Sequence, residues 1–280
     1  GCMSIGQDEN SGISILHEAL DKGINFFDTA DLYNNGLNET IVGKAFRGNR
    51  DKVVLATKVG NQLRADGSGW DWNPAKKYIL SSVEKSLQRL QTEYIDLYQL
   101  HGGMINDPID ETIEAFEILK QQGKIRYYGI SSIRPNVIRQ YVKMSSIVSV
   151  MMQYSLLDRR PEETCLQLLQ QNNIGVLSRG VVAQGLLIEK PAIAYLDHSA
   201  EEVKRASDAV AKISGPQRTK AQTALRFVLN NLAITSAVAG IRTMEQLKDT
   251  VETTATPPLT REELAFLQKQ ADPKTYKDHR

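Results

Sequence analysis

The sequence has few cysteines, no excess of charge of either sign and no long hydrophobic run, and each shortage excludes a class of protein. The only cysteines among its 280 residues are Cys2 and Cys165, which lack the spacing of a metal site and suggest no disulfide framework. We therefore expect a reducing compartment, the cytoplasm, and no bound metal. Lysine and arginine number 34 and the acids 33, a formal net charge of +1, so no basic field exists to attract nucleic acid or anionic lipid. Apolar runs such as Ile147 to Met152 are strand-sized and far shorter than the roughly 18 residues of a membrane span.

The composition is that of a soluble globular protein, with 41% hydrophobic and 24% charged residues. A chain of this length is ordinary either for one large α/β domain or for two small domains. The first residue, Gly1, is not a methionine. We expect that residues precede it and that loop residues are omitted near 191–197.

Segments typical of strands alternate with segments typical of helices almost throughout. The β-branched apolar run at 53–57 is typical of a parallel strand buried on both faces, and Ser199 with Glu202 has the pattern of a helix capping box. The predicted strands are 1–4, 24–27, 53–57, 94–100, 127–130, 148–152, 175–177 and 233–239, and the predicted helices are 13–22, 38–46, 73–90, 108–123, 161–171, 220–229 and those beginning near 135, 199, 243 and 260.

Eight strand–helix units in a row predict a parallel sheet, and we expect a single-domain (β/α)₈ TIM barrel over residues 1–280. The alternative is a two-domain doubly wound protein. That fold should carry G-x-G-x-x-G between its first strand and helix, and the sequence has no such motif there.

Polar side chains follow several of the predicted strands at the point where each strand ends. They are Asp28 with Tyr33 five residues later, Lys58, His101 and Gln153. Active sites of (β/α)₈ barrels lie at the carboxyl ends of the strands. We therefore expect these side chains to meet in space.

The acid, phenol, ammonium and imidazole together suit proton delivery to a carbonyl oxygen. A phenol has a pKa near ~10, so donating its proton at neutral pH requires a stabilised phenolate. A nearby lysine provides this, and an aspartate keeps that lysine charged. Taken singly, Asp28 is explained as a turn cap, Lys58 as a solvated strand end, and Tyr33 and His101 as structural residues. Their shared position at one end of adjacent strands favours the catalytic interpretation.

The segments around these residues resemble the signature regions of the aldo-keto reductases. The resemblance rests on Asp28–Tyr33, Ala56–Lys58, Leu100–Gly102, Gly129–Ser132 and Met152–Ser155. It covers essentially the whole chain and implies a (β/α)₈ barrel that binds NADPH without a Rossmann domain. The chain is most similar to the bacterial general-stress branch, which also resembles potassium-channel β subunits.

Carried over residue by residue, the resemblance implies that Tyr33 is the general acid, that Lys58 and Asp28 tune it, and that His101 orients the carbonyl. The nicotinamide carboxamide would be held by Ser131, Ser132 and Gln153, although many members have Asn where Ser132 stands. Arg179 occupies the position of an aromatic residue that stacks on the nicotinamide in many members, and a guanidinium plane can also stack.

The stretch Gly240–Leu247 resembles the family segment that grips the adenosine 2′-phosphate. Arg242 before a helix N-terminus suits a phosphate, and Gln246 matches a cofactor contact but also completes a capping box with Thr243. Asp249 matches the family's acid, and Thr250 stands where members usually have Asn. Two tryptophans on the loop after Lys58, Trp70 and Trp72, are explained either as a wall of the substrate pocket or as anchors of that loop.

The sequence thus predicts an NADPH-dependent enzyme that reduces a small-molecule carbonyl compound, acts as a monomer by default and has neither nucleic acid nor membrane as a partner. Two alternatives stay open. One is a cofactor-binding regulatory or redox-sensing subunit with weak turnover, similar to the channel β subunits. The other is a barrel aldolase or isomerase that uses Lys58 as a Schiff-base nucleophile, which leaves Tyr33 and His101 unexplained.

Overall fold

Helices and parallel strands alternate along the chain in the computed structural model, which describes residues 1–280. The chain divides into two compact units. The first unit comprises Gly1–Val150 with Gly240–Met244, and the second comprises Met151–Ala239 with Glu245–Arg280.

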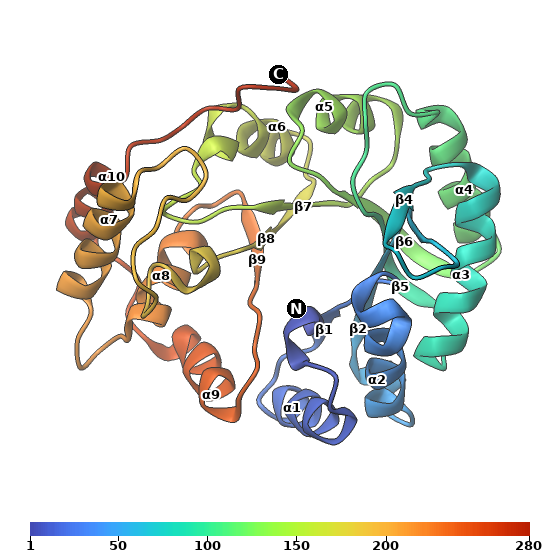
Figure 1. Ribbon diagram of the computed structural model, residues 1–280, viewed down its shortest axis with the longest axis horizontal. Helices are drawn as coiled ribbons and strands as arrows, with labels where there is room; N and C mark the ends of the chain where they lie inside the picture. The colour runs from blue at the N-terminus through green and yellow to red at the C-terminus, as the bar shows by residue number, and fades with distance from the viewer. The chain divides into compact units, whose positions relative to one another are not determined.

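The first unit is built on parallel strands in the order β1, β2, β5, β6. All six residues of β5 are buried, as expected for a parallel strand covered on both faces. Figure 1 shows helices α1 to α4 along these strands, coloured from blue to green. The elements are β1 (Phe26–Asp28), β2 (Val54–Val59), β5 (Ile95–Leu100), β6 (Ile125–Ser131), α1 (Glu9–Asp21), α2 (Leu37–Phe46), α3 (Lys76–Leu90), α4 (Ile109–Gln121) and α5 (Pro135–Met144).

A short antiparallel hairpin extends the connection after β2. It pairs β3 (Asn61–Leu63) with β4 (Trp70–Trp72) and lies outside the parallel sheet. We predicted a loop for this connection, whereas the structure has two short paired strands there. The guanidinium of Arg64 and the carboxylate of Asp71 face each other across the hairpin, with Nη2 and Oδ1 2.6 Å apart.

The second unit contains the parallel pair β8 and β9. Three of its helices begin with complete capping boxes, including the predicted Ser199–Glu202 box, which is confirmed. The strand β7 (Ser149–Gln153) crosses the boundary between the units. The remaining elements are β8 (Gly175–Arg179), β9 (Ile234–Val238), α6 (Cys165–Gln171), α7 (Ala200–Ile213), α8 (Lys220–Leu229), α9 (Met244–Glu252) and α10 (Arg261–Gln270).

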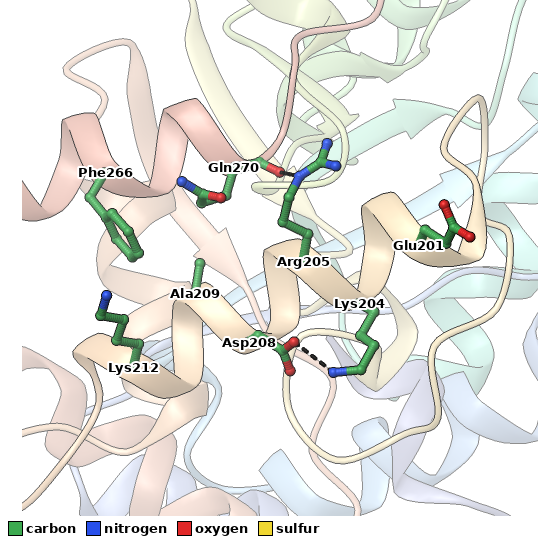
Figure 2. Close-up of a pocket in the computed structure, with 8 residues that line it drawn as sticks. All are labelled: Glu201, Lys204, Arg205, Asp208, Ala209, Lys212, Phe266 and Gln270. Atoms are coloured by element: carbon green, nitrogen blue, oxygen red, sulfur yellow. Dashed lines mark hydrogen bonds and ion pairs between the residues drawn. The ribbon is translucent and has the colours of Figure 1, made fainter.

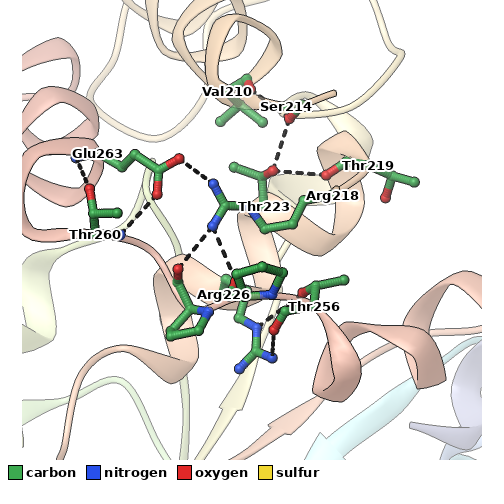
Figure 3. A network of polar contacts seen from close by, with 11 residues as sticks. Val210, Ser214, Arg218, Thr219, Thr223, Arg226, Thr256, Thr260 and Glu263 are labelled. Carbon is green, nitrogen blue, oxygen red and sulfur yellow. Dashed lines mark hydrogen bonds and ion pairs between the residues drawn. The ribbon is translucent and has the colours of Figure 1, made fainter. Parts of the chain in front are cut away.

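Two arginines of the second unit hold the segment that joins α9 to α10 (Figure 3). Arg218 is buried and donates to the main-chain oxygens of Pro257 and Pro258 and to the carboxylate of Glu263. Arg226 donates to the main-chain oxygen of Thr256. By hydrogen-bonding these main-chain oxygens, the two guanidinium groups stabilise a stretch that is only in part helical.

Four local predictions are wrong. The helix predicted from residue 13 begins at Glu9, because the Asp8 side chain caps the N-terminus there by accepting from the N–H of Asn10. The predicted strand at residues 1–4 is a 3₁₀ helix, Cys2–Ile5, which buries its first and last residues; this three-residue spacing suits a helical turn, whereas a strand buries alternate residues. The helix predicted from Asn73 begins at Lys76. The helix predicted over 161–171 is broken at Thr164, whose φ of −150° is not helical, into a 3₁₀ turn (Arg160–Glu163) and α6.

The other short 3₁₀ helices are Tyr33–Gly36, Arg50–Lys52, Ala183–Gly185 and Thr253–Ala255.

Candidate active site

Two neighbouring strands of the first unit bring Asp28 and Lys58 together. Asp28 ends β1, and Lys58 lies near the end of β2, with Asp28 paired in register to Ala56 and Lys58 to Gln99 on β5. Phe27 of β1 is buried in the core, which holds this strand in the sheet. Lys58 is only 1% exposed. The carboxyl ends of parallel strands therefore place an acid and an amine side by side in the interior.

The ammonium of Lys58 makes hydrogen bonds in three directions. Its Nζ lies 2.7 and 2.8 Å from the two carboxylate oxygens of Asp28, 2.7 Å from the main-chain oxygen of Thr29 and 3.3 Å from the hydroxyl of Tyr33. A charged lysine has three donors and no acceptor. The contacts match the charged form of Lys58.

The pKa of Lys58 is raised above its ordinary value. Burial alone lowers the pKa of this amine, but the charge of Asp28, followed by that of Tyr33, raises it by more. Lys58 therefore stays positively charged at neutral pH.

Tyr33 and His101 complete the cluster from two turns that follow strands. Tyr33 begins the 3₁₀ turn after β1. His101 follows β5, and its main-chain N–H donates to the main-chain oxygen of Val59 at 2.7 Å. The two rings meet edge to face with centroids 5.8 Å apart. Both side chains are half-buried. The structure thus brings together four of the five side chains that were predicted to meet, and the fifth, Gln153, belongs to the second unit.

The Asp28–Lys58 pair rests on further buried polar residues that the sequence analysis missed. Gln99 donates from Nε2 to Asp28 Oδ1 at 3.3 Å, and Asn38 accepts a 2.6 Å hydrogen bond from the Thr29 hydroxyl. Gln99 lies two residues before His101, so its inward direction follows from strand alternation. No local signal marks Asn38, because α2 brings it into place.

The first unit also contains four of the residues predicted to hold NADPH. Ser131 ends β6 and is half-buried, whereas Ser132 is buried and its hydroxyl accepts a hydrogen bond from the main-chain N–H of Arg134 at 3.2 Å. Gly240 lies so close to Ser4 that an added Cβ would come within 2.4 Å of the serine Oγ. Arg242 is exposed.

In the second unit, the side-chain amide of Gln153 is held at both ends. Its Nε2 donates to the hydroxyl of Tyr195 at 2.9 Å, and its Oε1 accepts from Arg179 Nη1 at 2.9 Å. An amide has a second N–H and a second lone pair, so Gln153 can still pair with a carboxamide. No local sequence pattern marks Tyr195, which lies in the irregular connection before α7.

The residues predicted on α9 differ in their environments. The carboxylate of Asp249 accepts hydrogen bonds from the hydroxyl of Thr219 at 2.9 and 3.1 Å, and its main-chain oxygen accepts from Gln222. Gln246 is exposed and Thr250 half-buried. Asp249 therefore joins α9 to the N-terminus of α8, and its negative charge does not suit a phosphate.

The two tryptophans of β4 have different roles. Trp72 donates from its indole N–H to the carboxylate of Asp107 at 3.0 and 3.1 Å. Its ring lies over Gly60 and Gly102, where an added Cβ would come within 2.7 and 3.1 Å of it. Trp72 thus anchors the hairpin to the connection that follows β5, next to His101. Trp70 is 47% exposed.

The donors and acceptors of these residues fit NADPH. In the first unit, the hydroxyl groups of Ser131 and Ser132 can pair with a carboxamide, and in the second unit the amide of Gln153 can do so. Arg242 lies two residues before the start of α9, and its guanidinium suits a phosphate. No set of three or more His, Cys, Asp and Glu side chains is arranged to bind a metal ion, and none of the helices has the length and hydropathy that a membrane crossing requires.

A surface groove between α7 and α10 of the second unit holds none of the predicted site residues (Figure 2). Four of its charged side chains have partners, and one of them, Arg205, donates to the main-chain oxygen of Gln270 at 3.2 Å. Lys204 pairs with Asp208 at 2.6 Å, and Lys212 lies 5.1 Å from the ring centroid of Phe266.

Comparison with known proteins places this geometry in a family. The model of the aldo/keto reductase family matches residues 1–272. An uncharacterized oxidoreductase of Bacillus subtilis, YqkF, is 50% identical over 289 aligned positions, which cover 100% of this chain and 94% of that protein.

Solved structures agree. The holo form of aldo-keto reductase AKR11C1 from Bacillus halodurans is 51% identical, with a TM-score of 0.93 over 100% of this chain and 93% of its own. An aldo/keto reductase from Klebsiella pneumoniae, solved in complex with NADP and acetate, is 28% identical, with a TM-score of 0.79 over 99% of this chain and 91% of its own. With its (β/α)₈ barrel fold and its matches along nearly the whole length, the chain belongs to the aldo/keto reductase family of oxidoreductases.

Proposed function

We propose that this protein reduces an aldehyde or ketone to the alcohol with NADPH, and that Tyr33 is the general acid. The observation that carries the proposal is the position of Lys58 Nζ, within hydrogen-bonding distance of both Asp28 and the Tyr33 hydroxyl. NADPH, when bound, supplies a hydride to the carbonyl carbon. The relatives solved with NADP or NADPH support this cofactor.

In the proposed reaction Tyr33 gives its proton to the carbonyl oxygen. The O–H bond of the phenol breaks, the O–H bond of the alcohol forms, and the phenolate that remains faces a charged lysine. Because Lys58 keeps three donors and a raised pKa, it can stabilise this phenolate by Coulomb attraction. A proton then returns to Tyr33 from solvent before the next turnover.

His101 is proposed to hold the carbonyl oxygen. Its ring lies edge to face with the ring of Tyr33, so a carbonyl oxygen that accepts from the imidazole lies near the phenol as well. A neutral imidazole N–H can orient a carbonyl group in this way.

The charged state of Lys58 argues against a Schiff-base enzyme. A lysine nucleophile needs an unprotonated amine with a free lone pair. Lys58 uses all three N–H groups as donors and is held charged by Asp28.

The predicted cofactor contacts remain proposals for each unit. In the first, we assign Ser131 and Ser132 to the nicotinamide carboxamide and Gly240 with Arg242 to the adenosine phosphate. In the second, we assign Gln153 and Arg179 to the nicotinamide, and Gln246 and Thr250 to the adenosine. For Asp249 we now propose a supporting role through Thr219. We also propose a cytoplasmic monomer, with residues 1–280 as one barrel domain and a small-molecule carbonyl compound as substrate.

Steady-state turnover tests this proposal against a regulatory subunit. The full chain is mixed with NADPH and 4-nitrobenzaldehyde, and loss of NADPH absorbance and formation of the alcohol are measured together. The proposal expects equal amounts of both over many turnovers. Tight binding of NADPH with less than one turnover per chain supports the regulatory subunit instead.

A further inference from the structure

Two carboxyl groups are buried beneath the turn that carries Tyr33. They belong to Asp31, which is 8% exposed, and Glu39 on α2, which is 0% exposed. The proposed reaction uses neither. We call Asp31 and Glu39 the buried acid pair.

Glu39 has the partners of an ionised carboxylate. Its Oε1 accepts from the hydroxyl of Thr57 at 2.6 Å, and its Oε2 accepts from Arg89 Nε at 2.7 Å and Nη2 at 2.6 Å. A carboxylate with an arginine and a hydroxyl as donors is stable in its charged form. The charges of Glu39 and Arg89 therefore compensate each other.

Asp31 has no comparable partner. Its Oδ1 is buried and makes no hydrogen bond. The two nearby cations are already paired with other acids: Lys58 with Asp28, and Arg89 with Glu39. An ionised Asp31 therefore adds one uncompensated negative charge to the interior, which is costly, whereas its protonated form adds none.

The groups that face Asp31 from neighbouring elements favour the protonated form. Burial first, and then the charge of Glu39, raise the pKa of Asp31 to about 7. Arg89, a hydrogen bond from the main-chain N–H of Leu32, and Lys58 oppose this rise. The other titratable groups around Asp31 are the phenols of Tyr78 on α3 and Tyr98 on β5. Burial raises the pKa of both, so they are neutral in this range.

The same residues hold the turn that carries Tyr33. The N–H of Asp31 donates to the main-chain oxygen of Lys58 at 3.3 Å. At the far end of the turn, Arg89 packs on Gly36, where an added Cβ would come within 2.8 Å of the arginine Cδ.

The turn itself is built from left-handed backbone conformations. Asn34 and Asn35 have φ values of 49° and 53°, and Gly36 follows with 86°. Asparagine adopts this conformation more readily than other residues with a side chain, but usually as a single residue and not in succession. The turn therefore depends on its contacts at both ends to keep Tyr33 in place.

We propose that Asp31 is a positioning residue for Tyr33: its carboxyl group carries a proton in the active protein, and loss of that proton displaces the turn that holds the tyrosine. The ionised carboxylate competes with Glu39 for the guanidinium of Arg89, which is also the support of Gly36. Reduction should therefore slow as the pH rises past the ionisation of Asp31. The inference rests on the proposed function of Tyr33.

Two spectroscopic titrations of the full chain test the inference without enzyme activity. Infrared difference spectra between about pH 5 and pH 9 report the carbonyl stretch of protonated carboxyl groups. We expect one carbonyl band of a buried carboxyl group that titrates near pH 7. The band should be missing in Asp31→Asn and should remain in Asp51→Asn, a control at an exposed residue. NMR of ¹³C-ζ-tyrosine, with Tyr33 assigned by Tyr33→Phe, should show the Tyr33 signal shifting over the same range in the natural protein but not in Asp31→Asn.

The pH profile of kcat adds the functional readout. If the ionised form is inactive, kcat should fall about tenfold between about pH 6 and about pH 8, because an acid is about 90% ionised one unit above its pKa. Asp31→Asn mimics the protonated form and should change less than about twofold, whereas Asp51→Asn should follow the natural protein.

Absence of an Asp31-dependent carboxyl signal, or a Tyr33 signal that shifts equally in Asp31→Asn, would overturn the inference. The inference would also be contradicted if Asp31→Asn and the natural protein had the same pH profile of kcat. If the protein reduces no carbonyl compound, the proposed function fails, and the two spectroscopic titrations still decide whether Asp31 holds a proton and moves Tyr33.

Discussion

Replacing Lys58 by methionine removes a buried charge and keeps most of the side-chain volume. Lys58 is 1% exposed, and its partner Asp28 is also buried. The variant leaves the Asp28 carboxylate in the interior with the Gln99 amide, 3.3 Å away, as its side-chain donor. The free energy of unfolding should therefore fall steeply.

The geometry sets the magnitude. At the 2.7 Å between Lys58 Nζ and Asp28 Oδ1, an effective dielectric constant of about 20 gives an attraction of about 6 kcal/mol. Removing one partner of a buried pair costs about 3–5 kcal/mol, because the other charge is left uncompensated. We expect that loss for Lys58→Met near neutral pH and a similar loss for Asp28→Asn. The double variant should recover most of it.

The penalty in Asp28→Asn should depend on pH. In Asp28→Asn, burial lowers the pKa of Lys58. That penalty is therefore present at neutral pH and disappears as the pH rises toward about 10.

Urea unfolding followed by circular dichroism measures these differences. Lys85→Met on the exposed face of α3 is the matched control and should change the free energy of unfolding by no more than about 0.5 kcal/mol. The reasoning about this pair would be refuted if each single variant lost less than about 1 kcal/mol of unfolding free energy. It would also be refuted if the double variant lost as much as the two single variants together.

Three further changes test other parts of the structure. Asp31→Asn should be more stable than the natural protein at about pH 8, by up to about 4 kcal/mol for a pKa raised from 3.8 to about 7. Because folding favours the protonated acid, this gain in stability should disappear as the pH falls toward 3.8. If urea unfolding gives the variant and the natural protein the same stability at about pH 8, the assignment is contradicted. Trp72→Phe removes the indole hydrogen bond to Asp107 and should cost about 1–2 kcal/mol, with faster amide exchange in the β3–β4 hairpin; unchanged exchange means that the contact does not anchor it. Gly43→Ala places a Cβ 2.4 Å from a main-chain oxygen of α3 and should lower Tm by overpacking of about 1–3 kcal/mol. Gly12→Ala meets side chains and no backbone, at 3.1 Å or more, and should lower Tm less; an equal loss of Tm in the two variants contradicts this reasoning.

The strand ends were the most predictable part of the molecule. A buried apolar run followed by a polar residue predicts where a parallel strand stops, and the rule that such ends meet at one edge grouped Asp28, Lys58 and His101 before their geometry was known. Helix starts with capping boxes were equally readable, as at Ser199, because the signal is local.

Features that depend on tertiary contact could not be predicted. The hairpin of β3 and β4 has only three residues per strand and depends on Trp72 packing over Gly60, which no local pattern reveals. The pairing of Gln153 with Tyr195 joins positions 42 residues apart. Asp31 reads as an ordinary polar turn residue, and only its burial shows that its charge has no partner.

The central claim is that the Tyr33 phenol, next to Lys58, supplies the proton for carbonyl reduction, and single-turnover kinetics test it most directly. NADPH-loaded Tyr33→Phe is compared with Tyr127→Phe, whose ring lies on the exposed part of β6, while NADPH binding is followed by fluorescence. We predict that Tyr33→Phe reduces 4-nitrobenzaldehyde about 10²–10⁴-fold more slowly with NADPH affinity nearly unchanged, and that Tyr127→Phe keeps its rate. A Tyr33→Phe variant that keeps most of its rate would contradict the claim, because the proton would then come from another group.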